Sequence, residues 1–201
     1  ITNDQSGGIR EKGVRAAFNR VFNPVRNFSD ETRQAFKRNA GGRFVANFKA
    51  KQVATELKKT AKLADTELDF DLARAIEDGT APDNELTRQF REIADKTRQE
   101  AVDAGLDIGY RENYVPHIWK QDVTEVDTIA RRAGLTARAE GERVIPTYAE
   151  GIELGLKPKY DSPADMMADY VRNLQTTQTT VALLTDLRAQ GLVGAGKLQD
   201  G

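Results

Sequence analysis

The sequence contains no cysteine and only one histidine, His117. Without cysteine the chain can form no disulfide bond and has no thiolate for catalysis or metal binding. A single histidine also excludes a zinc site built from several histidines of this chain. No apolar run approaches the roughly 20 residues that a helix needs to span a bilayer.

Hydrophobic residues are also scarce, at 39% of 201 residues, whereas charged residues make up 30%. This balance favours modestly packed or elongated helices over a dense α/β core. Aromatic residues, at 7%, argue against disorder throughout the chain. A chain of this length forms one domain or two small ones. Because it starts at Ile1 without a methionine or a signal-peptide pattern, we expect an internal piece of a longer polypeptide.

Charge is divided unevenly along the chain. Residues 1–64 contain 14 basic and 5 acidic residues, a net charge of +9, and residues 65–201 contain 16 and 26, a net charge of −10. We therefore expect a basic helical N-terminal region over 1–64 and an acidic helical domain over 65–201. A basic region of this kind is typical of a protein that meets a polyanion, or that packs on an acidic protein surface.

The residues expected to contact nucleic acid are Arg10, Lys12, Arg15, Arg20, Arg33, Lys37, Arg38, Arg43, Lys49 and Lys51. Phosphate contacts need only such charges and no fixed spacing. Six phenylalanines interleave with them and could stack on bases, although residues at this helical spacing more often belong to the core. These are Phe18, Phe22, Phe28, Phe36, Phe44 and Phe48. A solvated or partner-facing basic surface remains the alternative interpretation.

Apolar periodicity and capping residues predict an all-α protein of about six helices, arranged as an elongated or irregular bundle. In the first part of the chain we expect helices from Ser29 to the Gly41-Gly42 pair, over 43–63, and from Asp65 to Gly79, and residues 10–22 could form a further short basic helix. The helix over 43–63 carries a loose apolar stripe of Phe44, Phe48, Val53 and Leu57.

The helices of the second part are signalled more clearly. Leu86, Phe90 and Ile93 predict a helix from about residue 82 to Gly105, and shorter helices are expected over 123–133 and 147–154. The last helix begins at the Ser162-Pro163 pair and ends at Gly191. A seam predicts that it packs on another long helix, in this chain or in a second chain. The seam residues are Tyr170, Leu174, Thr177, Val181 and Leu184.

An ordered aromatic loop is expected near residues 106–122. It contains the only histidine, the only tryptophan and two of the five tyrosines. Val115 precedes a proline and is therefore expected to be extended. We expect five residues to lock the loop between two helices: Tyr110, Tyr114, Pro116, His117 and Trp119.

His117 and Glu112 are the candidate catalytic residues. The imidazole could act as a general base, with Glu112 or Asp122 to orient it. The alternative is a histidine that holds the loop through hydrogen bonds. Because the chain has no serine in a nucleophile motif and no second histidine, this alternative is favoured, and we assign no catalytic residue, metal site or cofactor.

A cluster of acids, Asp65, Glu67, Asp69, Asp71, Glu77 and Asp78, could hold Mg²⁺ or provide a general-acid pair. Asp69 and Asp71 would lie on different sides of a helix and would not converge. A solvated helix face is therefore the favoured interpretation of this cluster.

The charged helix ending at Ala104-Gly105, followed by Gly109-Tyr110-Arg111-Glu112-Asn113-Tyr114-Val115-Pro116-His117-Ile118, resembles a segment of very large phage and mobile-element proteins. These are the large polyvalent proteins and the giant internal virion proteins. The stretch from Gly155 to Asp165, followed by a long helix, resembles the same setting. The resemblance covers residues 80–190 and does not extend to the basic region. It implies a helical, non-enzymatic module of a protein that is packaged in the virion and delivered with the genome.

The leading expectation is thus a structural and interaction module, located in the virion or the host cytoplasm. Its partners would be other segments of a larger polypeptide, virion subunits or DNA. The main alternative is an enzyme domain, cell-wall lytic or nucleotide-acting, that uses Glu112 or His117. A DNA-binding anti-restriction or regulatory protein is a third possibility.

Overall fold

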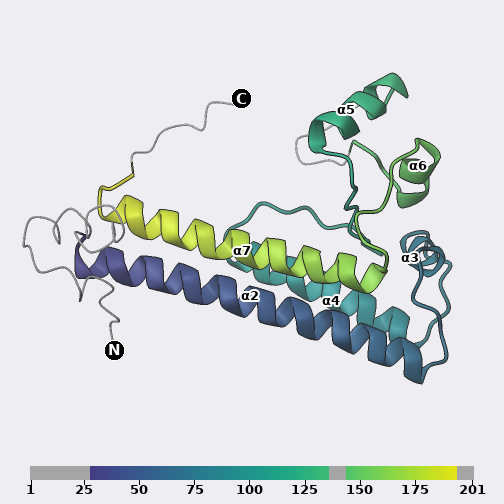
Figure 1. Ribbon diagram of the computed structural model, residues 1–201, viewed down its shortest axis with the longest axis horizontal. Helices are drawn as coiled ribbons and strands as arrows, with labels where there is room; N and C mark the ends of the chain where they lie inside the picture. Colours follow the sequence, from purple (N-terminus) through teal and green to yellow (C-terminus); the bar gives the residue numbers. More distant parts are fainter. Residues whose placement is uncertain (1–27, 136–143, 194–201) are drawn as a thin grey trace, which may run out of the picture. The chain divides into compact units, whose positions relative to one another are not determined.

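The computed structural model describes residues 28–135 and 144–193 of the chain. These residues form six α-helices and no strand, which confirms the all-α prediction (Figure 1). The expected helix over 10–22 lies outside the described residues. The helices are α2 (Asp30–Leu63), α3 (Phe70–Glu77), α4 (Glu85–Asp103), α5 (Val123–Arg132), α6 (Tyr148–Glu153) and α7 (Pro163–Ala189).

The chain divides into two compact units. In the described part, unit 1 contains residues 28–42 and 179–193, and unit 2 contains residues 43–178. The boundary crosses both α2 and α7. The expected division between residues 64 and 65 concerns charge, which is a different property, and it stays a prediction.

Unit 1 is an antiparallel pair formed by the first part of α2 and the last part of α7. Arg38 Nη2 donates to Asp186 Oδ2 at 2.7 Å, and Thr32 donates to the side chain of Gln190. As residue numbers rise on α2 they fall on α7, so the two helices run in opposite directions. The pair is further joined by residues at the boundary of the unit, where Asn39 Nδ2 lies 3.4 Å from the hydroxyl of Thr179.

The Gly41-Gly42 pair does not end a helix, and the prediction of a break there was wrong. α2 continues through both glycines. A glycine inside a helix costs only about 1 kcal/mol relative to alanine, and tertiary packing readily overcomes that cost. At Gly42 a Cβ atom would lie 2.2 Å from Cγ2 and 3.1 Å from Cβ of Thr179, so the glycine allows α7 to approach closely. At Gly41 no atom of the described residues, apart from the adjoining residues and backbone of α2 itself, lies within 4 Å of the corresponding position.

These neighbouring glycines are expected to respond to alanine with opposite signs. Gly41→Ala should raise the free energy of unfolding by about 0.5–1 kcal/mol, because alanine loses less backbone entropy on folding. Gly42→Ala should lower it by about 1–3 kcal/mol, because the new methyl group overpacks the contact with Thr179. Urea unfolding followed by circular dichroism measures both changes. Thr179→Ser removes Cγ2 and should reduce the cost of Gly42→Ala; equal effects of the two alanines would contradict this account.

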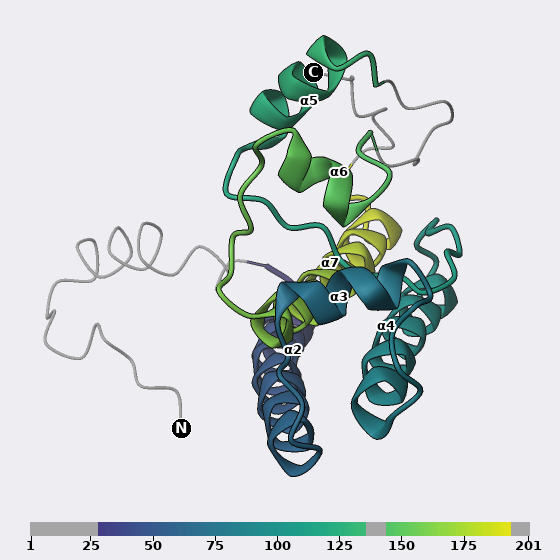
Figure 2. The same ribbon diagram turned by 90° about the vertical axis from the view of Figure 1, so that its right-hand side faces the viewer.

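Unit 2 is built on three helical segments that lie alongside one another: residues 43–63 of α2, the whole of α4, and residues 163–178 of α7 (Figure 1). Figure 2 shows α3 lying across the end of these segments, with α6 and α5 beyond it. The largest fully buried side chains of this core come from α2, α3, α4, α6, α7 and the segment between α4 and α5. They include Leu57, Ile76, Leu86, Phe90, Val115, Tyr148, Met166 and Met167.

The buried face of α2 in unit 2 differs from the expected one. Leu57 is buried and Val53 is partly buried as predicted, but Phe44 is 73% exposed and Phe48 is 56% exposed. The helix instead buries a stripe of small residues, Ala46, Ala50 and Ala61, together with Leu57. Both stripes have helical spacing, so periodicity alone cannot choose between them. Alanines allow the neighbouring helices to pack closely, and the phenylalanines remain outside.

Several helices begin at a residue whose side chain accepts a hydrogen bond from a backbone N–H of the first turn. Asp122 caps α5 and Thr147 caps α6, each with a reciprocal capping box. α3 starts later than expected, with Asp69 rather than Asp65 as its N-cap. Asp65 has a φ of 47°, a left-handed conformation typical of the residue that follows a helix. It therefore belongs to the end of α2.

Candidate functional site

The expected ordered loop over residues 106–122 is confirmed, and a buried carboxylate anchors it. The Glu77 side chain at the end of α3 is only 3% exposed, and that of His117 is 6% exposed. His117 Nε2 lies 2.8 Å from Glu77 Oε1, and the backbone N–H of Tyr148 donates to Oε2 at 2.7 Å. Arg111 Nη2 is 3.7 Å from Oε1. A single carboxylate thus joins α3, the loop and the first residue of α6.

An aromatic cluster surrounds this anchor. The Tyr148 ring is stacked between Phe70 and Trp119, with centroid distances of 5.3 and 4.9 Å. The His117 ring lies 5.8 Å from the ring of Trp119. Gly151 on α6 provides the space for the indole, because a Cβ atom there would lie 2.4 Å from Cζ2 of Trp119. The cluster therefore fixes both the loop and α6.

Two backbone hydrogen bonds attach the loop to the segment that precedes α7. The N–H of Lys120 donates to the carbonyl of Lys157 at 2.8 Å, and the N–H of Lys159 donates to that of Ile118 at 2.9 Å. They form an isolated antiparallel bridge between Trp119 and Pro158. Loop, α3, α6 and the start of α7 are thereby held as one assembly.

The structure does not bring the two candidate catalytic residues into one site. His117 lines a cleft of about 380 Å³ with Ile118 and Trp119, whereas Glu112 is exposed and lines a separate cleft of about 240 Å³. Asp122, the other expected partner of His117, accepts the N–H of Glu125 at 2.8 Å as the cap of α5. The contact of His117 with Glu77 matches the alternative interpretation, a histidine that holds the loop.

The interpretation of the acidic cluster as a solvated face was wrong for Glu77. Glu77 lies at the end of α3, where the loop covers it. This burial depends on the tertiary fold and could not be predicted from the neighbouring sequence alone. Asp69 accepts the N–H of Leu72 at 2.8 Å as a helix cap, and Asp71 pairs with Arg74 at the surface. Within residues 28–135 and 144–193, no three histidine, cysteine, aspartate or glutamate side chains are grouped so that they could hold a metal ion.

The hydroxyl of Tyr148 is fully buried and has no hydrogen-bond partner among the described residues. Burial raises the pKa of this phenol, and the positive charge of Arg74 offsets part of the effect. A raised pKa stabilises the folded state fully below the ordinary pKa of about 10, and this contribution is lost as the pH rises above that value.

Tyr148→Phe is therefore expected to leave the free energy of unfolding at pH 7 unchanged, or to raise it by about 1 kcal/mol, because an unpaired buried hydroxyl is removed. Between pH 10 and 12 the variant should lose less stability than the wild type. Urea unfolding across this pH range measures the difference. Tyr110→Phe, at a largely exposed tyrosine, is the matched control and should behave like the wild type. A larger alkaline loss in Tyr148→Phe would refute the assignment.

The residues expected to contact nucleic acid fall into three groups. Arg10, Lys12, Arg15 and Arg20 lie outside the described residues. Three others have acidic partners: Arg33 pairs with Asp30, Arg38 with Asp186, and Lys49 with Glu100 at 3.6 Å. The remaining three, Lys37, Arg43 and Lys51, are exposed and form no ion pair within the described part of the chain.

Within unit 2, one side of α2 collects exposed cations and aromatic rings. We call Phe44, Phe48, Lys51, Lys59 and Lys62 the outer face of α2. They share one side because separations of 4, 7, 15 and 18 residues from Phe44 are close to whole helical turns. All five are exposed, and none of the three lysines forms an ion pair among the described residues. Lys59 and Lys62 belong to the basic region of residues 1–64, although they are not among the ten residues expected to contact nucleic acid.

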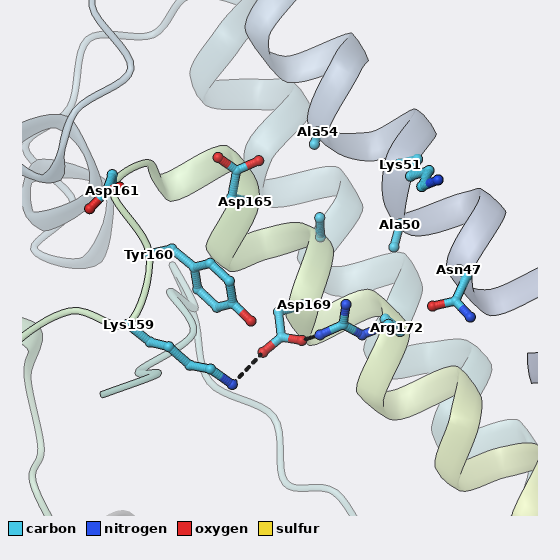
Figure 3. A pocket seen from close by; sticks show the side chains of 11 residues that line it. Asn47, Ala50, Lys51, Ala54, Lys159, Tyr160, Asp161, Asp165, Asp169 and Arg172 are labelled. Atoms are coloured by element: carbon cyan, nitrogen blue, oxygen red, sulfur yellow. Dashed lines mark ion pairs between the residues drawn. The ribbon is translucent and has the colours of Figure 1, made fainter. Parts of the chain in front are cut away.

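A cleft of about 380 Å³ beside α2 is charge-balanced (Figure 3). Its buried carboxylate, Asp169, lies 3.8 Å from Lys159 Nζ and forms an ion pair with Arg172. At the edge, Lys58 donates to Asp165 at 2.8 Å. In Figure 3 the ammonium group of Lys51 points away from these carboxylates. Lys159 and Arg172 of the cleft are therefore committed to structural pairs, whereas Lys51, which also lines the cleft, forms no ion pair among the described residues.

Comparison with protein-family models, with curated proteins and with solved structures found no match for this chain. The resemblance of residues 80–190 to phage and mobile-element proteins thus stays a prediction. The helices of the described part include none that is long and apolar enough to cross a membrane.

Proposed function

We propose that this chain is a structural and interaction module of a large phage-type virion or ejected protein, and that it contacts nucleic acid through α2. The observation that carries the proposal is the set of exposed α2 cations that have no acidic partner among the described residues: Lys37, Arg43, Lys51, Lys59 and Lys62.

Charge on a firmly held helix suits contact with a phosphate backbone. The opposite side of α2 is packed through Ala50 and Leu57, so the outer lysines are presented from a fixed position. Binding of a polyanion to unpaired cations releases counterions and requires no existing ion pair to break. Paired cations such as Lys58, which already contacts Asp165, would have to give up a partner first.

A structural role for the central loop agrees with the same proposal. Glu77 and the ring of Tyr148 surround His117 and hold it in place. His117 lines a cleft, but its side chain is only 6% exposed and its Nε2 is already in contact with Glu77. The loop thus contributes rigidity, and we assign molecular contact to α2.

The proposal predicts that the full chain binds DNA with an affinity that falls steeply as salt increases. Replacing Lys51, Lys59 and Lys62 together by glutamine should reduce the slope of log K against log [salt] by about 2–3, since each phosphate contact contributes about 0.7–0.9. Fluorescence anisotropy with labelled duplex and single-stranded oligonucleotides, at several salt concentrations, measures this slope.

The matched control changes the same total charge elsewhere. Lys96, Lys120 and Lys157 are also exposed but lie outside α2. Their replacement by glutamine should leave most of the slope intact. An absence of DNA binding at low salt would sink the proposal, and equal losses in the two triple variants would move the contact away from α2.

A further inference from the structure

We infer that the outer face of α2 is a binding site for single-stranded nucleic acid, in which the rings of Phe44 and Phe48 stack on bases. This inference rests on the proposed function and names its ligand class. It starts from the exposure of the two rings, 73% and 56%, on a helix whose opposite side is packed into the core. Neither ring is needed to fill that core.

The spacing of the two rings fits neighbouring bases of a flexible strand. Phe44 and Phe48 are one helical turn apart, about 6 Å along the axis. Base–aromatic stacking requires an uncovered base face, and every base of an unpaired strand can present one. In a duplex, adjacent base pairs cover these faces. Two exposed rings therefore favour a single strand, whereas lysines alone would bind either form.

Beyond the two rings, the outer face of α2 carries cations. Lys51, Lys59 and Lys62 extend the face to about 27 Å from Phe44 along the helix axis. Sites for single strands combine a basic track for the phosphates with aromatic rings for the bases. No carboxylate among the described residues pairs with any of these three lysines. The part of the face beyond the rings is thus complementary to a polyanion.

The distribution of apolar side chains argues against an anionic membrane as the ligand. A helix that lies in a membrane surface needs an apolar face along its length. On α2 the exposed large apolar residues Phe44, Val45 and Phe48 lie within about one turn and a fourth, Leu63, is the last residue of the helix, whereas the face between carries Lys51, Lys59 and Lys62. A single nucleic-acid strand fits this arrangement, because its bases can stack on the rings while its phosphates contact the lysines.

The test measures binding of the full chain to a 20-nucleotide thymidine strand and to a 20-base-pair duplex by fluorescence anisotropy at fixed salt. The wild type should bind the single strand more tightly. The Phe44→Ala/Phe48→Ala variant should lose about 30-fold or more in affinity for the single strand, and no more than about twofold for the duplex. Tyr110→Ala/Val123→Ala removes two exposed apolar side chains elsewhere and should change neither.

Each outcome has a defined meaning. Salt-dependent binding that the Phe44→Ala/Phe48→Ala variant leaves unchanged, or weakens equally for both forms, would overturn the inference and leave the proposed function standing. Failure of the wild type to bind either nucleic acid would overturn both. Vesicles containing phosphatidylserine are the third probe: binding to them that depends on the two rings, without ring-dependent binding of the single strand, would replace nucleic acid with a lipid surface.

Discussion

Replacement of Glu77 by alanine is expected to lower the free energy of unfolding by about 2–5 kcal/mol. The carboxylate contacts Nε2 of His117 and the backbone N–H of Tyr148, both within 2.8 Å, and all three residues are shielded from water. A buried donor that loses its partner costs about 1–3 kcal/mol, and here two are left at once. Because the same carboxylate joins α3, the loop and α6, the loss should affect all three together.

Urea unfolding followed by circular dichroism tests this expectation. Asp78→Ala changes the adjacent, exposed acid and should stay within about 0.5 kcal/mol of the wild type. Glu77→Gln keeps one carbonyl acceptor and should fall between the wild type and Glu77→Ala. His117→Gln should also reduce stability while leaving DNA binding by the folded protein intact. Equal stabilities of Glu77→Ala and Asp78→Ala would show that the loop is not anchored as described.

Replacement of Phe90 by alanine should cost about 3–5 kcal/mol, since this fully buried ring on α4 lies in the main core of unit 2. The deletion would leave a cavity among closely packed side chains. Phe48→Ala on α2 provides the matched comparison, because the same atoms are removed from a largely exposed side chain. Its effect should stay within about 0.5 kcal/mol.

Denaturant unfolding of the two variants separates the competing assignments of the α2 faces. A large loss of stability in Phe48→Ala would place this ring in the core, as the sequence pattern first suggested, and would remove it from the proposed binding face. A small loss would also establish that variants of the outer face fold normally, so that their binding can be compared with that of the wild type.

Local signals were sufficient for much of the fold. The Ser162-Pro163 start of α7 acts within one helical turn, so the sequence contains the whole signal. The caps Asp122 of α5 and Thr147 of α6 act over the same short range but were not predicted. Gly105, Gly134 and Gly191 follow helices with positive φ, as their positions indicated. The ordered loop was predictable because a proline and several aromatic residues stand together in an otherwise charged chain.

The features that the sequence did not predict depend on contacts between residues that are far apart in the chain. On α7 the expected seam agrees with the buried positions only in part: Tyr170 is partly buried against the core, whereas Thr177 is exposed and the buried residues nearby are Val171 and Gln175. Glu77 looked like one acid among six, because its partners His117 and Tyr148 lie 40 and 71 residues away. Gly42 was predicted to end a helix, because its contact with Thr179 on α7 is not visible in the local sequence. Helical periodicity shows which residues share one side of a helix. It identifies the buried side only when the neighbouring helix is known.

The position of Trp119 has a practical consequence, because it is the only tryptophan of the chain. Its indole lies against Gly151, close to the ring of Tyr148, so its fluorescence emission is a local reporter of loop docking. Detachment of the loop would transfer the indole to water and shift the emission to longer wavelength, while α2, α4 and α7 could retain their helical signal. The chain thus carries its own optical probe for distinguishing release of the loop from melting of the helices.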